Sequence, residues 1–237
     1  MSEKNILSEG ISLYQKNDFT SALTYFISLP DDSEVDNIEL AYYIGLCYAK
    51  LERYDDALLY IEQVVTAGKN PDQVLQCRYL LAVIYAVSGR KKLADFELNK
   101  LLEIGYKPAS VYSSLAYIAW TQNEIEKCLD YYKKALDIDP ENLTALNGMG
   151  YVLACEEREL TMALSYCKRA LDKSPNSAAC LDSVGWVYHK LGLKSDAEKY
   201  LLQAHSLKPE NNEIIEQIGI NKINARYKSF EYSNNSL

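Results

Sequence analysis

The sequence predicts an all-α solenoid of stacked antiparallel helix hairpins, and three observations lead to this fold class. The chain of 237 residues contains only ten glycines and six prolines, which disfavours a turn-rich β-sandwich. The prolines recur at intervals of 41, 37, 32, 35 and 34 residues, at Pro30, Pro71, Pro108, Pro140, Pro175 and Pro209. Because proline ends helices, regular prolines indicate regular helix ends, and this period is typical of a solenoid.

The third observation is a pair of small residues that recurs within each period. The second member follows the first by twelve or thirteen residues, which suits two helices whose backbones cross closely. The pairs are Gly10 and Ala22, Gly45 and Ala57, Ala82 and Ala94, Ala116 and Cys128, Gly150 and Ala163, and Gly185 and Ala197. Each period therefore predicts a helix–turn–helix hairpin, which cannot bury its apolar face without a neighbour.

A turn followed by a helix start separates the two small residues of each pair. The turns, in chain order, are residues 17–19, 53–55, 88–90, 123–125, the longer run 156–160 with one extra residue, and 191–193. Asp18 and Asn123 have side chains that suit helix N-caps. Ser195 to Glu198 has the spacing of a capping box.

These segments resemble the tetratricopeptide repeat, whose pattern is a large residue, Leu-Gly, an aromatic, a turn, Ala, an aromatic, Ala and Pro. The matching residues are Leu181 to Tyr188 with Ala197, Leu201, Ala204 and Pro209, and also Tyr112, Leu115, Ala116, Ile125, Tyr132, Ala135, Leu136 and Pro140. The resemblance implies a right-handed superhelix of six repeats in a single domain over residues 1–226. The repeats start near Glu3, Ile38, Leu75, Ala109, Leu143 and Ala178.

After the sixth repeat we expect a solvent-facing capping helix from about Asn212 to Arg226, and then a disordered tail over residues 227–237. The last two repeats are similar to a variant common in bacterial tetratricopeptide proteins. That subfamily often occurs in envelope lipoproteins, so the resemblance leaves an envelope-anchored alternative open.

Charge and cysteine content exclude several classes of function. The net charge is −8 and both halves of the chain are acidic, so neither nucleic acid nor an anionic membrane surface is an expected partner. The longest apolar run, Tyr79 to Val87, is far shorter than the roughly 20 residues of a membrane span. The six cysteines form no Cys-x-x-Cys pair and only two histidines are present, so we expect reduced thiols, no metal and no cofactor.

The N-terminal residues show no secretion signal, so a cytoplasmic location is expected. A periplasmic or envelope-anchored location is the alternative if a native signal was removed. Catalysis is not expected either: Asp182 and His189 share a helix face, but they lack a nucleophile unless Cys155 or Ser183 is recruited.

In the family that this chain resembles, the first helix of each hairpin lines a concave groove. In this register the groove residues are rich in aromatic side chains, which provide contact area at low entropic cost. We expect Trp120, Tyr151 and Trp186 to anchor a peptide, while Asn147, Asp182 and His189 bond to its backbone. The full predicted peptide-binding set is Tyr42, Leu46, Tyr79, Tyr117, Trp120, Asn147, Tyr151, Asp182, Trp186, His189 and Lys190.

The chaperone-adaptor subfamily binds a terminal carboxylate through Lys and Asn in its first three repeats. Here those positions hold apolar or aromatic residues: Leu7, Ile11, Leu46, Tyr79 and Val83. An acidic chaperone tail is therefore not expected as the ligand. As an alternative, Lys190 with Asn147 could still hold one carboxylate in the second half of the chain. The sequence predicts a non-enzymatic scaffold or adaptor that binds a segment of a partner protein. The scaffold could also form homo-oligomers. The alternatives are an envelope-assembly factor of the bacterial lipoprotein type and a self-assembling structural protein.

Overall fold

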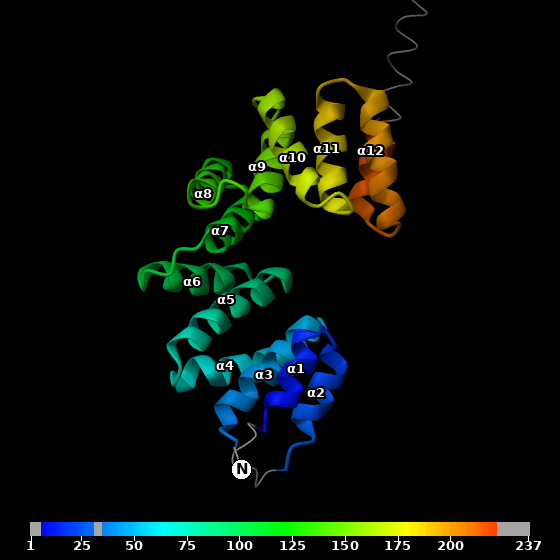
Figure 1. The fold of residues 1–237 in the computed structure, drawn as a ribbon. Helices are drawn as coiled ribbons and strands as arrows, with labels where there is room; N and C mark the ends of the chain where they lie inside the picture. The colour runs from blue at the N-terminus through cyan, green and yellow to red at the C-terminus, as the bar shows by residue number, and fades with distance from the viewer. Residues whose placement is uncertain (1–5, 31–34, 222–237) are drawn as a thin grey trace, which may run out of the picture. The chain divides into compact units, whose positions relative to one another are not determined.

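The computed structural model describes residues 6–30 and 35–221, and every regular element in those ranges is a helix (Figure 1). The predicted all-α fold of repeated hairpins is confirmed. The chain divides into two compact units, one ending at Lys107 and the other beginning at Pro108. The predicted first repeat start at Glu3, the end of the capping helix near Arg226 and the predicted tail lie outside the described residues.

Unit 1 consists of three helix hairpins. In each hairpin the two helices pack against one another, and α2 and α4 also contact the first helix of the next hairpin. The helices are α1 (Ser8–Gln15), α2 (Phe19–Ile27), α3 (Asn37–Lys50), α4 (Tyr54–Ala67), α5 (Pro71–Val87) and α6 (Lys91–Glu103).

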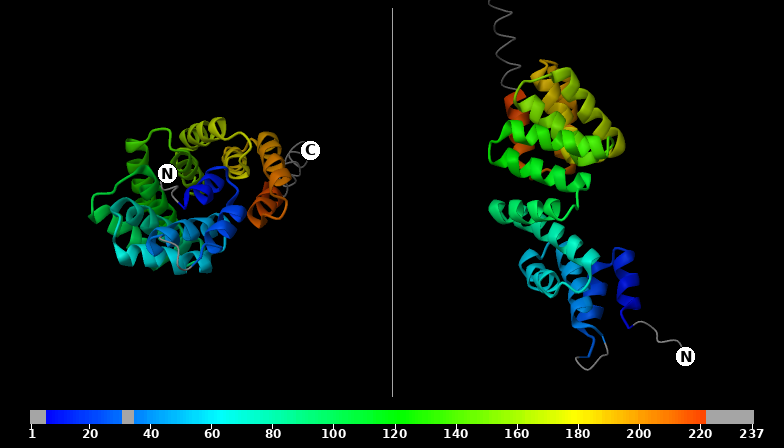
Figure 2. Two further views of the ribbon diagram at one scale, coloured as in Figure 1. Left: turned by 60° about the horizontal axis from the view of Figure 1, so that its bottom comes forward. Right: turned by 90° about the vertical axis from the view of Figure 1, so that its left-hand side faces the viewer.

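Unit 2 also contains three hairpins, and its first helices α7, α9 and α11 contact one another in series (Figures 1 and 2). The helices are α7 (Ala109–Thr121), α8 (Ile125–Ile138), α9 (Leu143–Cys155), α10 (Leu160–Lys173), α11 (Ala178–Lys190) and α12 (Lys194–Leu207). Residues 212–221 form a further helix, which we call the final helix. Because α7, α9 and α11 adjoin, residues at equivalent positions on them share one side of the unit.

In each hairpin turn a residue just after the first helix has the left-handed backbone conformation. These residues are Asn17, Glu52, Gly89, Asn123, Glu157 and Gly192, with φ between 53° and 78°. The N–H of the following residue then bonds to the carbonyl five residues earlier, as from Arg53 to Tyr48 at 2.9 Å. This is the Schellman motif, which satisfies the carbonyls at a helix C-terminus and reverses the chain. The longer fifth turn contains a second left-handed residue, Glu159, with φ 46°. The same backbone conformation therefore recurs in all six hairpin turns, with Asn, Glu or Gly at the left-handed position.

The predicted helix caps had mixed outcomes. Asp18 caps α2, since its side chain accepts a hydrogen bond from the Ser21 N–H at 3.1 Å. Asn123 does not cap α8; it is the left-handed turn residue, a conformation that asparagine tolerates better than most residues. The capping box at Ser195 was also wrong, because α12 already begins at Lys194.

The small-residue pairs lie where the two helices of a hairpin cross, as predicted. A methyl group added at Gly45 would lie 2.7 Å from Ile61 Cγ1, and one added at Gly150 would lie 2.7 Å from the Ala163 carbonyl oxygen. The second members of the pairs are fully buried. The glycines thus let α3 approach α4, and α9 approach α10, more closely than a side chain would permit.

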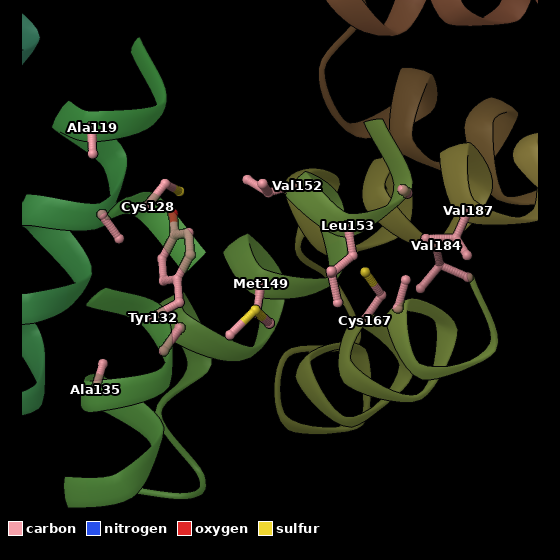
Figure 3. Packing of buried hydrophobic residues seen from close by; sticks show 14 of the residues in the cluster. Ala119, Cys128, Tyr132, Ala135, Met149, Val152, Leu153, Cys167, Val184 and Val187 are labelled. Atoms are coloured by element: carbon pink, nitrogen blue, oxygen red, sulfur yellow. The ribbon is translucent and has the colours of Figure 1, made fainter. Parts of the chain in front are cut away.

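In unit 2 the buried side chains form a core that links all three hairpins. Figure 3 shows Cys128 and Tyr132 of α8 near Met149 of α9, with Cys167 of α10 and Val184 of α11 continuing the cluster. All six cysteines of the chain have free thiols, and five are buried. Burial raises the pKa of the Cys128 thiol to about 12, so it packs as a protonated apolar group.

None of the helices formed by residues 6–30 and 35–221 has the length and apolar character needed to span a membrane.

Candidate functional site

Unit 2 contains a cavity of about 860 Å³, which we call the C-terminal groove. Side chains from α7, α9 and α11 line it, together with residues that follow α12. Five of the predicted peptide-binding residues are among its lining residues: Tyr117, Trp120, Asn147, Tyr151 and Asp182. The structure therefore brings together residues that are up to 65 positions apart in the sequence.

One wall of the C-terminal groove is aromatic. The rings of Trp120 and Tyr151 meet edge to face, with centroids 6.4 Å apart and planes at 83°. Tyr117, one helical turn before Trp120, is 49% exposed. The Tyr132 ring reaches the groove from α8 by packing against Gly148, where an added methyl group would collide with it. The wall therefore consists of aromatic side chains, and an edge-to-face pair of this kind is stabilising.

Two acidic residues, Asp182 and Glu213, also line the groove. Asp182 is only 7% exposed, and its Oδ2 accepts a hydrogen bond from Gln217 Nε2 at 3.4 Å. Burial raises the pKa of Asp182 to about 7, and the charge of the nearby Glu213 adds to the rise. No described residue provides a hydrogen-bond partner for Asp182 Oδ1 or Asn147 Oδ1. The groove thus holds buried acceptors that the described protein does not satisfy.

The final helix contacts α9 and α11, the first helices of the last two hairpins. The Tyr151 hydroxyl donates a hydrogen bond to Glu213 Oε1, and His189 Nδ1 lies 2.9 Å from Asn221 Oδ1. With Gln217, the three partners on the final helix are four residues apart and so lie on one face of it. Ile214, Gln217 and Asn221 are buried against unit 2, whereas Glu213 at the start of the helix is exposed.

Trp186, His189 and Lys190 of α11 form a cluster with one another and do not line the C-terminal groove. The His189 ring stacks on Trp186 with centroids 4.9 Å apart, and Lys190 Nζ lies 5.0 Å from the Trp186 centroid. Lys190 also forms an ion pair of 2.9 Å with Glu157. These three side chains are thus engaged within unit 2.

The other predicted peptide-binding residues, Tyr42, Leu46 and Tyr79, belong to unit 1. Tyr42 and Leu46 are buried, and the Tyr42 hydroxyl donates to Gln76 Oε1 at 2.6 Å. Tyr79 is half-buried on α5. This unit has a cavity of about 450 Å³, lined by residues of α2 and by Tyr48, Leu51 and Arg53. Tyr42, Leu46 and Tyr79 do not line it. We therefore leave them out of the candidate site.

The residues that follow α12 were not among the predicted peptide-binding residues. Lys208, Asn211, Glu213 and Ile214 line the C-terminal groove, and Gln217 bonds to its buried aspartate. Their signal in the sequence is weak: Glu213, Gln217 and Asn221 recur every four residues, as expected of one helix face, but polar residues at that spacing normally indicate a solvated surface.

Family models described as the tetratricopeptide repeat match residues 7–74, 109–142 and 178–211. None of the curated proteins matches the chain by sequence. Many solved structures resemble its fold. One is in the crystal structure of the APC/C hetero-tetramer Cut9–Hcn1, with a TM-score of 0.76 and 14% identity over 91% of this chain. This chain spans only 42% of that protein's length.

Two smaller proteins are covered more completely. A tetratricopeptide repeat protein from Parabacteroides merdae ATCC 43184 has a TM-score of 0.69 and 14% identity, over 92% of this chain and 83% of its own. YrrB, described as a TPR protein with an unusual peptide-binding site, has a TM-score of 0.52 and 18% identity, over 84% of this chain and 96% of its own. At these identities the likeness shows the fold alone.

Proposed function

The chain belongs to the tetratricopeptide repeat family, and from this premise we propose that it is a non-enzymatic scaffold that holds a segment of a partner protein in the C-terminal groove. The family's fold generally serves as a protein–protein interaction scaffold, and fold alone does not identify the partner. The proposal therefore depends on what the groove offers a ligand. YrrB, which shares the fold, is described as having a peptide-binding site, and this supports the proposal.

The observation that carries the proposal is the pairing of an aromatic wall with unsatisfied polar groups in one cavity. The aromatic side chains of Tyr117 and Trp120 line the groove, while the oxygens of Asn147 and Asp182 have no partner among the described residues. A peptide supplies both complements, since its apolar side chains can cover the rings and its N–H groups can donate to the oxygens. A cavity of about 860 Å³ is large enough for several side chains.

A selection from a display library of random short peptides tests this function directly. The immobilised wild-type protein should enrich a family of peptides, and Tyr117→Ala should lose most of them because that ring is an exposed part of the groove wall. Tyr106→Ala is the matched control, since Tyr106 is an exposed tyrosine of unit 1. Enrichment of no peptide family, or equal enrichment by the Tyr117→Ala protein, would contradict the proposal.

A further inference from the structure

The unsatisfied atoms of the C-terminal groove are hydrogen-bond acceptors. A carboxylate oxygen such as Asp182 Oδ1 can only accept, and it is buried in a residue that is 7% exposed. Asn147 Oδ1 lines the same groove and also lacks a partner among the described residues. A neutral peptide N–H could satisfy one of these atoms. A group that carries several donors and no acceptor would satisfy both at once, and lysine and arginine side chains have this property.

The charges around Asp182 favour a cation at the same place. On the final helix, Glu213 is close enough for its charge to raise the pKa of Asp182, and Gln217 donates the one hydrogen bond. On α9, Asn147 and Tyr151 are uncharged, and the Tyr151 hydroxyl donates to Glu213. Burial of a carboxylate beside a second one is costly unless a positive charge compensates it.

Neither basic residue near the groove compensates Asp182. Lys190 of α11 forms its ion pair with Glu157 instead. Lys208 lines the groove but is exposed, and it forms no ion pair with Asp182. Among the described residues Asp182 forms no ion pair. A basic side chain of a ligand would supply the positive charge that this carboxylate lacks.

The aromatic wall suits the rest of such a side chain. Trp120 and Tyr151 line the groove together with Asp182, so an aliphatic stem can lie against their rings while its charged end reaches the carboxylate. Tryptophan and tyrosine faces also attract cations directly.

We propose that the C-terminal groove binds a lysine or arginine side chain of the partner segment, with Asp182 and Glu213 holding its positive charge. This inference rests on the proposed function, and it names the chemistry of the ligand that the groove selects. The occupant is therefore a basic segment of a partner protein.

The test uses the full chain and compares the peptides selected from the random display library by wild type, by Asp182→Asn and by Glu213→Gln. Asp172→Asn is the matched control, because it removes the same charge from an exposed position on α10. Wild type and Asp172→Asn should enrich peptides with lysine or arginine at one fixed position. Asp182→Asn keeps a group that can accept from Gln217 but lacks the charge, so it should lose this preference.

The best basic peptide is then compared with the same peptide carrying glutamine at that position. Wild type should prefer the basic peptide by about tenfold or more, and the preference should largely vanish in Asp182→Asn and weaken in Glu213→Gln. Selected peptides without an enriched basic position, or an equal preference in Asp182→Asn, would overturn this inference and leave the proposed function standing. If no peptide family is selected at all, both the function and the inference fail.

Discussion

The Tyr151 hydroxyl donates a hydrogen bond to Glu213, a residue that lies 62 positions later in the chain. This contact joins α9 to the start of the final helix, two segments that α10, α11 and α12 separate in the sequence. Two further contacts, from Gln217 to Asp182 and between His189 and Asn221, continue along the same helix face. The final helix is thus fixed by polar contacts to the inner side of unit 2, and it completes one end of the C-terminal groove.

Replacing Tyr151 by phenylalanine should loosen the final helix. The ring and its contact with Trp120 stay, but Glu213 loses its hydrogen bond, so the free energy of unfolding should fall by about 1 to 2 kcal/mol. Urea unfolding measures the change, and amide exchange over residues 212–221 should rise. Tyr106→Phe, at an exposed site in unit 1, is the control. Unchanged exchange in the final helix would show that this contact does not hold it.

The stability of the protein should depend on the ionisation of Asp182. Its pKa is raised from 3.8 to about 7 in the folded state, so the folded state binds the proton more tightly than the unfolded state does. Ionised Asp182 therefore lowers the free energy of unfolding. This destabilisation is complete above about pH 7 and fades as the pH falls towards 4. Because a tenfold change in proton affinity corresponds to about 1.4 kcal/mol, the effect is a few kcal/mol at most.

Asp182→Asn removes this ionisation, so at about pH 8 the variant should be more stable than wild type, and at about pH 5 the advantage should shrink. Urea unfolding of both proteins across this range measures the difference. Asp172→Asn, at an exposed site, should show no such trend. A variant that loses stability equally at both pH values would contradict the raised pKa.

Glycine-to-alanine substitutions should have opposite effects at the crossing of α9 and α10 and in the final helix. At Gly150 the added methyl group would lie 2.7 Å from a backbone oxygen, so Gly150→Ala should destabilise unit 2 by about 1 to 3 kcal/mol. At Gly219, in the final helix, nothing lies within 4 Å of the added group. Gly219→Ala should therefore stabilise the protein by up to about 1 kcal/mol through helix propensity. Thermal unfolding separates the two outcomes, and equal effects would contradict the packing described for Gly150.

The sequence was sufficient to predict the hairpins because two simple requirements repeat in it. A helix must end near each proline, and the two helices of a hairpin need small residues where they cross, as Gly45 and Gly150 show. The turn residues were less predictable. Asn123 and Glu52 adopt the same left-handed conformation, although asparagine resembles a cap residue and glutamate gives no turn signal.

The candidate site was predicted in part, and the limit has a physical cause. The repeat register placed Trp120, Asn147 and Asp182 on the first helices of their hairpins, and in the structure all three line one cavity. The register does not indicate which inner positions a following helix covers. For this reason His189, which bonds to Asn221, was predicted as a ligand contact. Whether any of the predicted residues contacts a partner stays a prediction.

The most direct test of the account measures the affinity of the best selected peptide for wild type, Trp120→Ala and Trp186→Ala, with circular dichroism to check that both variants stay helical. Trp120 lines the groove, whereas Trp186 stacks on His189 outside it. The account predicts that Trp120→Ala weakens binding by about 30-fold, or roughly 2 kcal/mol, and that Trp186→Ala changes it by less than about threefold. Equal affinity of Trp120→Ala and wild type would contradict the assignment of the C-terminal groove as the binding site.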